Sequence, residues 1–142
     1  MSKIFNETSV DIVLPNYNSE LYVSETIDSI INQTFKNWKI NIIDDNSNNE
    51  TQKVLEKYAK HPKINIMWLK KNKRPAFCRN LAIRNSRSEY IAFIDADDIW
   101  DKEKLSRQLD FMMKNKYDFT YTNYLPFRTD RNQNNLKEIK PA

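Results

Sequence analysis

Apolar and polar residues follow two different periods along the chain, and the change between them predicts alternating strands and helices. Short runs that are continuously apolar or alternate with a period of two predict strands at residues 10–14, 39–44, 64–69, 90–94 and 118–124. Apolar residues at helical spacing predict helices over residues 19–33 and 75–86 and around Leu55 and Leu109. The run at 90–94 is apolar throughout, which favours a buried strand.

This order of elements favours an α/β fold, with a mostly parallel sheet and helices on both faces. Ligands of such sheets bind beyond the carboxyl ends of the strands. Polar segments follow the first four predicted strands, at residues 16–18, 44–45, 71–74 and 95–98. We therefore expect these four segments to meet at one edge of the sheet.

The chain of 142 residues suits one domain. We assign it to residues 9–125, preceded by an arm at 1–8 and followed by a polar tail at 126–142. No apolar run approaches the roughly 20 residues that cross a membrane, and residues 1–8 lack the apolar core of a signal peptide. These features predict a cytoplasmic protein, with peripheral placement at the inner face of the membrane as a further expectation.

The composition limits the kinds of metal, phosphate and nucleic-acid site that the chain can form. One cysteine, Cys78, and one histidine, His61, exclude an internal disulfide and a Cys/His zinc cluster, so a metal site must use mainly oxygen ligands, as Mg²⁺ or Mn²⁺ prefer. Glycine is absent, which excludes glycine-rich phosphate loops, and asparagine is the residue that best replaces it in left-handed turns. The net charge of +4 comes without an arginine-rich stripe, so we expect no nucleic-acid partner.

Three carboxylates lie within the four residues 95–98, directly after a predicted strand. Like charges so close together repel each other, and a divalent cation relieves that repulsion. A cation held by one or two carboxylates keeps positions free for phosphate oxygens. Acidic residues also favour the start of a helix. The residues alone leave both interpretations open, a cation site and an acidic helix start.

Three further groups each have a functional and a plain interpretation. Asp44 and Asp45 can accept hydrogen bonds from a ribose or a base, but they also suit an ordinary turn. Arg79 can bind phosphate or clamp neighbouring carboxylates. The basic side chains at 71–74 offer positive charge near a diphosphate or simply face solvent, and we predict a packing role for Cys78.

The ordered motifs resemble those of the family 2 glycosyltransferases with a GT-A fold. Residues 10–18 (VDIVLPNYN) look like the family's first strand with its Pro-Thr-Tyr-Asn exit, and residues 29–34 end in the Gln-Thr of its SLLxQT helix. Residues 44–47 (DDNS) match DDGS with Asn in place of Gly. Residues 72–80 (NKRPAFCRN) resemble NxGxxxARN, and residues 90–100 (YIAFIDADDIW) resemble YIAFLDADDxW.

The resemblance implies a Rossmann-like GT-A fold and an inverting transfer of sugar from a nucleoside-diphosphate sugar. The acceptor would be a saccharide or a lipid-linked molecule, and the pathway cell-surface polysaccharide biosynthesis. The implied donor-binding residues are Pro15, Asn16, Tyr17, Asp44, Asp45, Arg79, Asp95 and Ala96. Asp97 would coordinate Mn²⁺ or Mg²⁺, with support from Asp95 and Asp98.

The chain departs from the family pattern in two ways. The glycines expected near Lys73, Arg74, Ala82 and Ser88 are missing. The family's catalytic base is a carboxylate in the acceptor-binding half, so we expect it beyond Ala142, regard the chain as C-terminally truncated and assign no catalytic residue.

Two alternatives to an active enzyme remain. One is a nucleotide-binding module without turnover of its own. The other is a receiver-like signalling domain, which needs its acidic pair after the first strand and a lysine after the fifth. Here the acidic residues follow the second and fourth predicted strands, which disfavours that domain.

Overall fold

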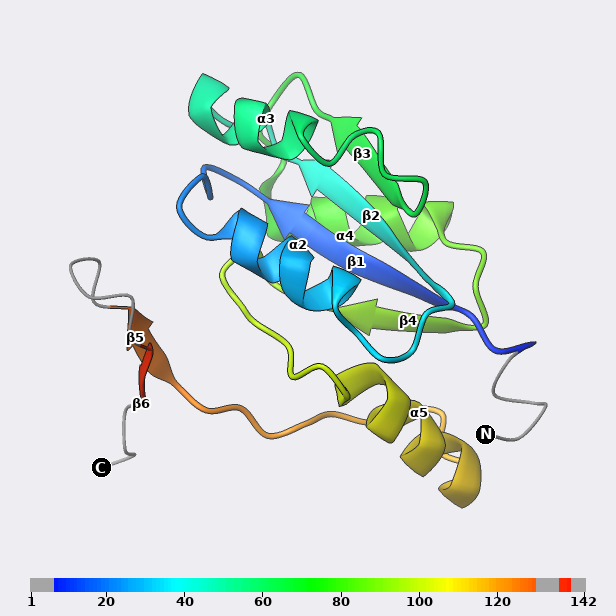
Figure 1. Cartoon of the computed structure of the whole chain (residues 1–142). Helices are drawn as coiled ribbons and strands as arrows, with labels where there is room; N and C mark the ends of the chain where they lie inside the picture. Colours follow the sequence, from blue (N-terminus) through cyan, green and yellow to red (C-terminus); the bar gives the residue numbers. More distant parts are fainter. Residues whose placement is uncertain (1–6, 130–135, 139–142) are drawn as a thin grey trace. The chain divides into compact units, whose positions relative to one another are not determined.

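The computed structural model describes residues 7–129 and 136–138 (Figure 1). The chain forms two compact units, Met1–Arg107 and Gln108–Ala142. The predicted arm lies outside the described residues except for 7–8, and the predicted tail except for 126–129 and 136–138, so the boundaries at 9 and 125 stay predictions. In the described part, every helix is too short or too polar to span a membrane.

The first unit contains a four-stranded parallel sheet with the strand order β3-β2-β1-β4. Its strands are β1 (Val10–Asn16), β2 (Trp38–Asp44), β3 (Ile64–Trp68) and β4 (Tyr90–Phe93). The helices between them are α2 (Val23–Ile31), α3 (Asn49–Glu56) and α4 (Arg74–Asn85). The predicted α/β class is confirmed.

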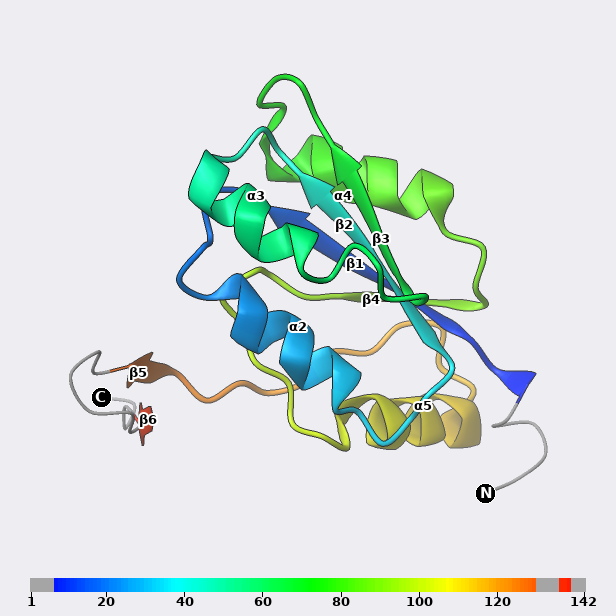
Figure 2. The ribbon, with the colours of Figure 1, turned by 45° about the horizontal axis from the view of Figure 1, so that its top comes forward.

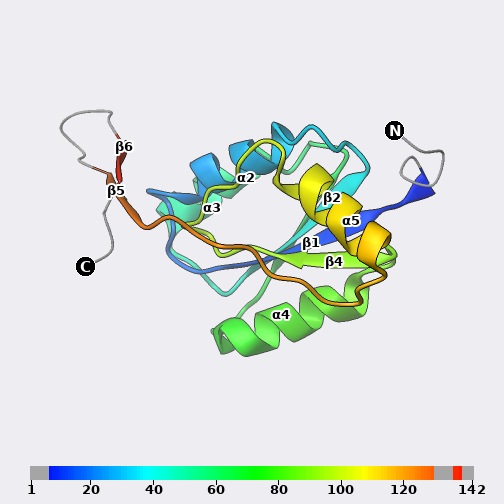
Figure 3. The same cartoon turned by 90° about the horizontal axis from the view of Figure 1, so that it is seen from below.

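The helices cover both faces of this sheet. Figure 3 shows α2 and α3 on one face and α4 on the other, and Figure 2 shows the same layers from another side. Under α4, Val13 and Ile43 pack against Cys78 and Ala82, and all four are fully buried. Burial, followed by the nearby charges of Asp45 and Asp44, raises the pKa of the Cys78 thiol to about 11. The predicted packing role of Cys78 is confirmed.

The strand order creates a switch point between β1 and β4. The chain moves outward from β1 to β2 and β3, and then returns to the other side of β1 for β4. Connections that leave neighbouring strands in opposite directions open a crevice at their carboxyl ends, where ligands of open α/β sheets bind. The segments after β1 and β4 flank this crevice.

Helix α5 (Lys104–Asn115) begins in the first unit and ends in the second. Within the second unit, β5 (Phe127–Thr129) pairs with β6 (Leu136–Glu138) in an antiparallel ladder.

The strand predicted at residues 118–124 is wrong, because this segment forms neither strand nor helix. Phe119 and Tyr121 alternate with polar residues as a strand requires, yet they are 79% and 85% exposed. A strand needs a partner for its backbone groups, and none of the described residues pairs with this segment. The alternation of apolar and polar residues alone therefore did not suffice to form a strand.

Strand β4 is at the edge of the sheet instead of being buried as predicted. It pairs only with β1 among the described strands, and Ile91 and Phe93 are 38% and 50% exposed. A short apolar run indicates a strand but does not say whether it is flanked on both sides.

Asparagine takes the place of glycine in two turns. Asn18 and Asn46 have positive φ angles of 45° and 62°, and Asn46 stands at the glycine position of the DDGS motif. Asparagine tolerates this left-handed region better than most residues. Arg74, at the start of α4, has a φ of 74° without that advantage.

We expect Arg74→Gly to raise the free energy of unfolding by about 1 kcal/mol, because glycine removes the clash of a side chain in the left-handed region. Urea denaturation measures the change. Arg84→Gly, in the last turn of the same helix, is the matched control and should lower the free energy by about 1 kcal/mol. Equal losses in both variants would show that Arg74 is not strained.

Candidate functional site

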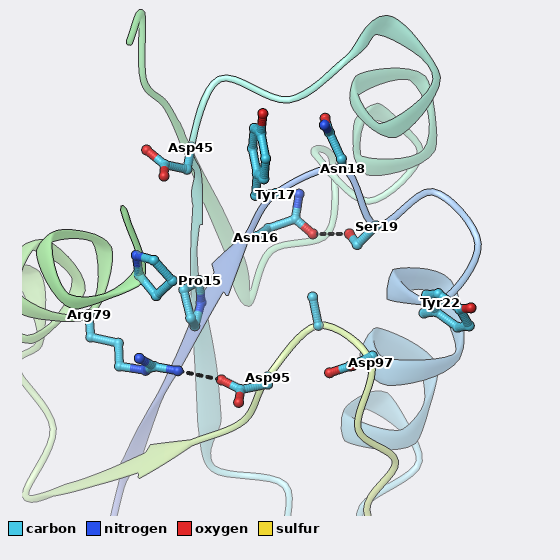
Figure 4. A pocket seen from close by; sticks show the side chains of 12 residues that line it. Pro15, Asn16, Tyr17, Asn18, Ser19, Tyr22, Asp45, Arg79, Asp95 and Asp97 are labelled. Atoms are coloured by element: carbon cyan, nitrogen blue, oxygen red, sulfur yellow. Dashed lines mark hydrogen bonds and ion pairs between the residues drawn. The ribbon is translucent and has the colours of Figure 1, made fainter. Parts of the chain in front are cut away.

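A pocket of about 390 Å³ lies at the carboxyl edge of the sheet, at the switch point between β1 and β4. Its size falls in the range of roughly 300–1,000 Å³ typical of small-molecule sites. Figure 4 shows the side chains that line it. They are Pro15, Asn16, Tyr17, Asn18, Ser19, Tyr22, Asp45, Pro75, Arg79, Asp95, Ala96 and Asp97.

The four polar segments meet at this edge as expected. Three of them contribute lining side chains, and the fourth, at 71–74, reaches Asp45 through the backbone N–H groups of Lys73 and Arg74. Of the predicted site residues, Asp44 and Asp98 are not among the lining residues. The basic side chains at 71–74 are not among them either.

A hydrogen-bond network around Asn16 fixes the exit of β1. The Asn16 amide donates to Asp44 Oδ1 at 2.9 Å and to Ser47 Oγ at 3.4 Å, and its oxygen accepts from the Ser19 hydroxyl. The fully buried Asp44 also accepts from the Ser47 backbone N–H at 3.1 Å. Asp44 thus holds the loops after β1 and β2 together from beneath the pocket. The more exposed Tyr17 is available to a ligand.

Asp45 joins the loop after β2 to the start of α4. Its two carboxylate oxygens accept from the backbone N–H groups of Lys73 at 2.6 Å and Arg74 at 2.8 Å. A carboxylate at a helix N-terminus interacts favourably with the positive end of the helix dipole. Asp45 therefore holds the start of α4 at the pocket, which Pro75 and Arg79 of this helix line.

The acidic segment, which we define as residues 94–103, supplies the opposite wall. Arg79 Nη2 donates to Asp95 Oδ1 at 2.7 Å, across half-exposed side chains. Such a pair adds at most about 1 kcal/mol to stability, so its main effect is to orient Asp95. Figure 4 marks no such interaction between Asp97 and the other residues drawn. Asp97 is exposed at the pocket.

The electrostatics of the acidic segment fit a cation. Burial, and then the charges of Asp97 and Asp95, raise the pKa of the Asp98 carboxyl. A divalent cation would relieve this repulsion. Within residues 7–129 and 136–138, no three His, Cys, Asp or Glu side chains form a metal-binding group. A cation at Asp97 would therefore need further oxygens from a ligand, as Mg²⁺ commonly takes from phosphates.

Sequence reasoning assigned no binding role to four lining residues: Asn18, Ser19, Tyr22 and Pro75. Asn18 belongs to the segment 16–18 that was expected at this edge, and Ser19 directly follows that segment. Tyr22 and Pro75 carry no chemical signal in the sequence, because packing alone brings them to the pocket.

A parallel α/β sheet with a pocket at its switch point places the protein in the class of open α/β folds, which bind their ligands at that point. Residues 11–141 match the model of Glycosyl transferase family 2, and the chain belongs to this family. The predicted resemblance is confirmed.

Two relatives show the sequence similarity. A UDP-Glc:alpha-D-GlcNAc-diphosphoundecaprenol beta-1,3-glucosyltransferase, WfgD of Escherichia coli, is 39% identical over 116 residues, which are 81% of this chain and 45% of that protein. A Bacillus subtilis (strain 168) relative whose name refers to teichuronic acid biosynthesis, TuaG, is 36% identical over 81% of this chain and 46% of its own length. The chain thus spans less than half of either relative.

Solved structures share the fold. The crystal structure of S. aureus TarS 1-349 in complex with UDP has a TM-score of 0.71 and 28% identity, over 77% of this chain and 33% of that one. The mannosyltransferase PcManGT of Pyrobaculum calidifontis, in complex with GDP-Man and Mn²⁺, has a TM-score of 0.67 and 22% identity, over 72% and 32% of the two chains. These neighbours agree with the GT-A-like arrangement.

Proposed function

We propose that this chain binds the donor of an inverting glycosyltransferase, which transfers a sugar from a nucleoside-diphosphate sugar to a saccharide or lipid-linked acceptor in cell-surface polysaccharide biosynthesis. One observation carries the proposal. The pocket has Asp45 and the β1 exit on one side and Arg79 with Asp95 and Asp97 on the other. A nucleoside diphosphate needs these two environments, one for the base and ribose and one for the diphosphate.

Each wall has a role in this proposal. The residues Pro15 to Tyr17 and Asp45 hold the base, and Asp44 supports them from below. Asp95 and Ala96 lie against the ribose or the donor sugar, and Arg79 keeps Asp95 in place. Asp97 holds Mn²⁺ or Mg²⁺ with support from Asp95 and Asp98. When bound, the cation supplies positive charge that stabilises the departing diphosphate.

The transfer itself needs one more group. An acceptor hydroxyl attacks the sugar C1 from the face opposite the diphosphate, the C1–O bond to the diphosphate breaks, and a base takes the hydroxyl proton. We place this base beyond Ala142, in an acceptor-binding half. The second candidate, a nucleotide-binding module without turnover, shares the donor pocket and differs only in lacking that base.

The names of similar proteins guide the choice of nucleotide and pathway. The TarS structure contains UDP, and the name of WfgD specifies UDP-Glc and a diphosphoundecaprenol-linked acceptor. The name of the Bacillus relative refers to teichuronic acid biosynthesis. We therefore expect UDP to bind more tightly than the other nucleotides, and we place the protein in the cytoplasm at the inner face of the membrane.

Calorimetric titration of UDP, GDP, CDP and dTDP, each with and without Mn²⁺, tests the donor site. We expect UDP to bind, and we expect Mn²⁺ to tighten this binding about tenfold or more, the equivalent of about 1.4 kcal/mol. Asp97→Ala should remove this gain, because the variant lacks the carboxylate that holds the cation. Asp110→Ala, which changes an exposed aspartate of α5, is the control and should leave binding unchanged. If folded protein bound none of the four nucleotides, the proposal would be overturned.

A further inference from the structure

The acidic segment follows β4 without any regular secondary structure. Residues 94–103 form no helix or strand, yet they carry the carboxylates at the pocket. Backbone groups outside helices and strands need other partners to be held in one place. The identity of those partners decides how well Asp95 and Asp97 are positioned.

Three polar side chains of α2 and the turn after it supply these partners. Thr26 Oγ1 donates to the backbone oxygen of Ala96 at 2.9 Å, between Asp95 and Asp97. Ser29 Oγ accepts from the Trp100 backbone N–H at 3.1 Å. These residues are spaced three apart and so lie on one face of the helix.

Gln33 holds the end of the acidic segment and the start of α5. Its Nε2 donates to the backbone oxygen of Asp101 at 2.6 Å, and its Oε1 accepts from the Leu105 backbone N–H at 3.0 Å. Gln33 thus satisfies one acceptor before α5 and one of the free donors in its first turn. A single side chain fixes both the end of the acidic segment and the entry to the helix.

Burial shows that these contacts are specific. Thr26 and Gln33 have no exposed surface, and a buried hydroxyl or amide costs free energy unless it is hydrogen-bonded. An apolar residue would fill either position without that cost. The hydrogen bonds they make instead reach the backbone on both sides of Asp97, at Ala96 and at Asp101.

We propose that Thr26 and Gln33 are positioning residues that determine how much affinity the pocket gains from a divalent cation. The proposal rests on the donor-binding function above. Neither side chain lines the pocket or touches the base-binding side, where Pro15 and Asp45 lie. Their loss should therefore weaken the contribution of the cation while the affinity for the nucleotide alone is retained.

Calorimetry of the full chain with UDP, in the presence and absence of Mn²⁺, tests this inference. In Thr26→Val, which keeps the shape but removes the hydroxyl, we expect the metal-free affinity for UDP to stay within about twofold of the parent. The gain from Mn²⁺ should fall about tenfold, the lower end of the effect of residues that orient metal ligands. Thr26→Ser keeps the hydroxyl and should restore the gain.

Thr51→Val is the matched control. Thr51 is also a fully buried threonine on a helix, but its hydroxyl donates to Glu20 Oε2 at 2.7 Å, away from the acidic segment. This variant should keep the full gain from Mn²⁺. Gln33→Met should behave like Thr26→Val, with a larger loss, and thermal melts will show whether it folds; if it does not, the threonine variants carry the test alone.

The outcomes separate the two proposals. If the parent chain binds UDP with a gain from Mn²⁺ and Thr26→Val keeps that gain, the positioning role is overturned and the donor site stands. If Thr26→Val loses metal-free and metal-dependent binding equally, the role of Thr26 is structural only, which also overturns the inference. If the parent binds no nucleotide, the proposed function fails first, and the inference fails with it.

Discussion

Asp45→Ala is expected to lower the free energy of unfolding by about 3 kcal/mol. The variant loses two charge-assisted hydrogen bonds, from the backbone N–H groups of Lys73 and Arg74, each worth roughly 1.5–3 kcal/mol. Lys73 and Arg74 are exposed, so water can reach their N–H groups in the variant and the lower end of that range applies. Without the carboxylate, Arg74 loses a hydrogen bond that helps to hold its left-handed conformation.

The same change should reduce the affinity for UDP by more than about tenfold, the equivalent of 1.4 kcal/mol. Asp45 lines the pocket and also places the first turn of α4, so both direct contact and shape are lost. Urea denaturation and calorimetry measure the two effects. Asp45→Asn keeps one acceptor oxygen and should fall between the parent and Asp45→Ala.

Asp28→Ala provides the control for this variant. Asp28 is exposed on α2 and accepts from the Tyr58 hydroxyl at 3.0 Å. Its removal should cost less than about 1 kcal/mol, as is usual for a surface interaction. A loss of stability in Asp45→Ala no larger than in Asp28→Ala would contradict the capping role of Asp45.

Asp44→Ala should lower the free energy of unfolding by a similar amount, about 3 kcal/mol, for a different reason. The change leaves two buried donors, the Asn16 amide and the Ser47 backbone N–H, without their acceptor. Each unsatisfied buried donor costs roughly 1–3 kcal/mol, and removing the desolvation cost of the buried charge offsets part of this. A double-mutant cycle with Asn16→Ala should show a coupling of more than about 1 kcal/mol.

Asp11 offers a control that matches Asp44 in burial and bonding. It is a buried aspartate near the amino end of β1, and it accepts from the backbone N–H groups of Arg87 and Ser88 at 2.6 and 3.0 Å. Asp11→Ala should lose comparable stability and leave the affinity for UDP unchanged. Asp44→Ala should weaken UDP binding, because the β1 exit loses its support. Equal affinities in the two variants would refute a link between Asp44 and the pocket.

Much of the fold followed from the sequence because it depends on local periodicity. Four of the five predicted strands formed within one or two residues of their expected ends. The parallel order then placed the residues after β1, β2 and β4 at one edge, as the general geometry of such sheets requires. Asn18 and Asn46 took up left-handed turns, which also depends on the residue itself.

Other features depended on partners that are distant in the sequence. The strand predicted at 118–124 had the right pattern but no strand to pair with among the described residues. Asp44 and Asp45 are chemically identical neighbours and both are buried, yet only Asp45 lines the pocket. Local sequence could not separate them, because Asp44 ends β2 and Asp45 follows it, and only packing decides what each side chain meets.

The amino-acid sequence by itself determined the α/β class, the family and the acidic residues after β4. Only the tertiary structure showed what holds those residues in place. Thr26 and Ala96 are 70 positions apart, and the hydrogen bond between them forms only when α2 lies beside the segment after β4. Periodicity and residue type act over a few neighbours, whereas the partner of a buried hydrogen bond is set by how the whole chain packs.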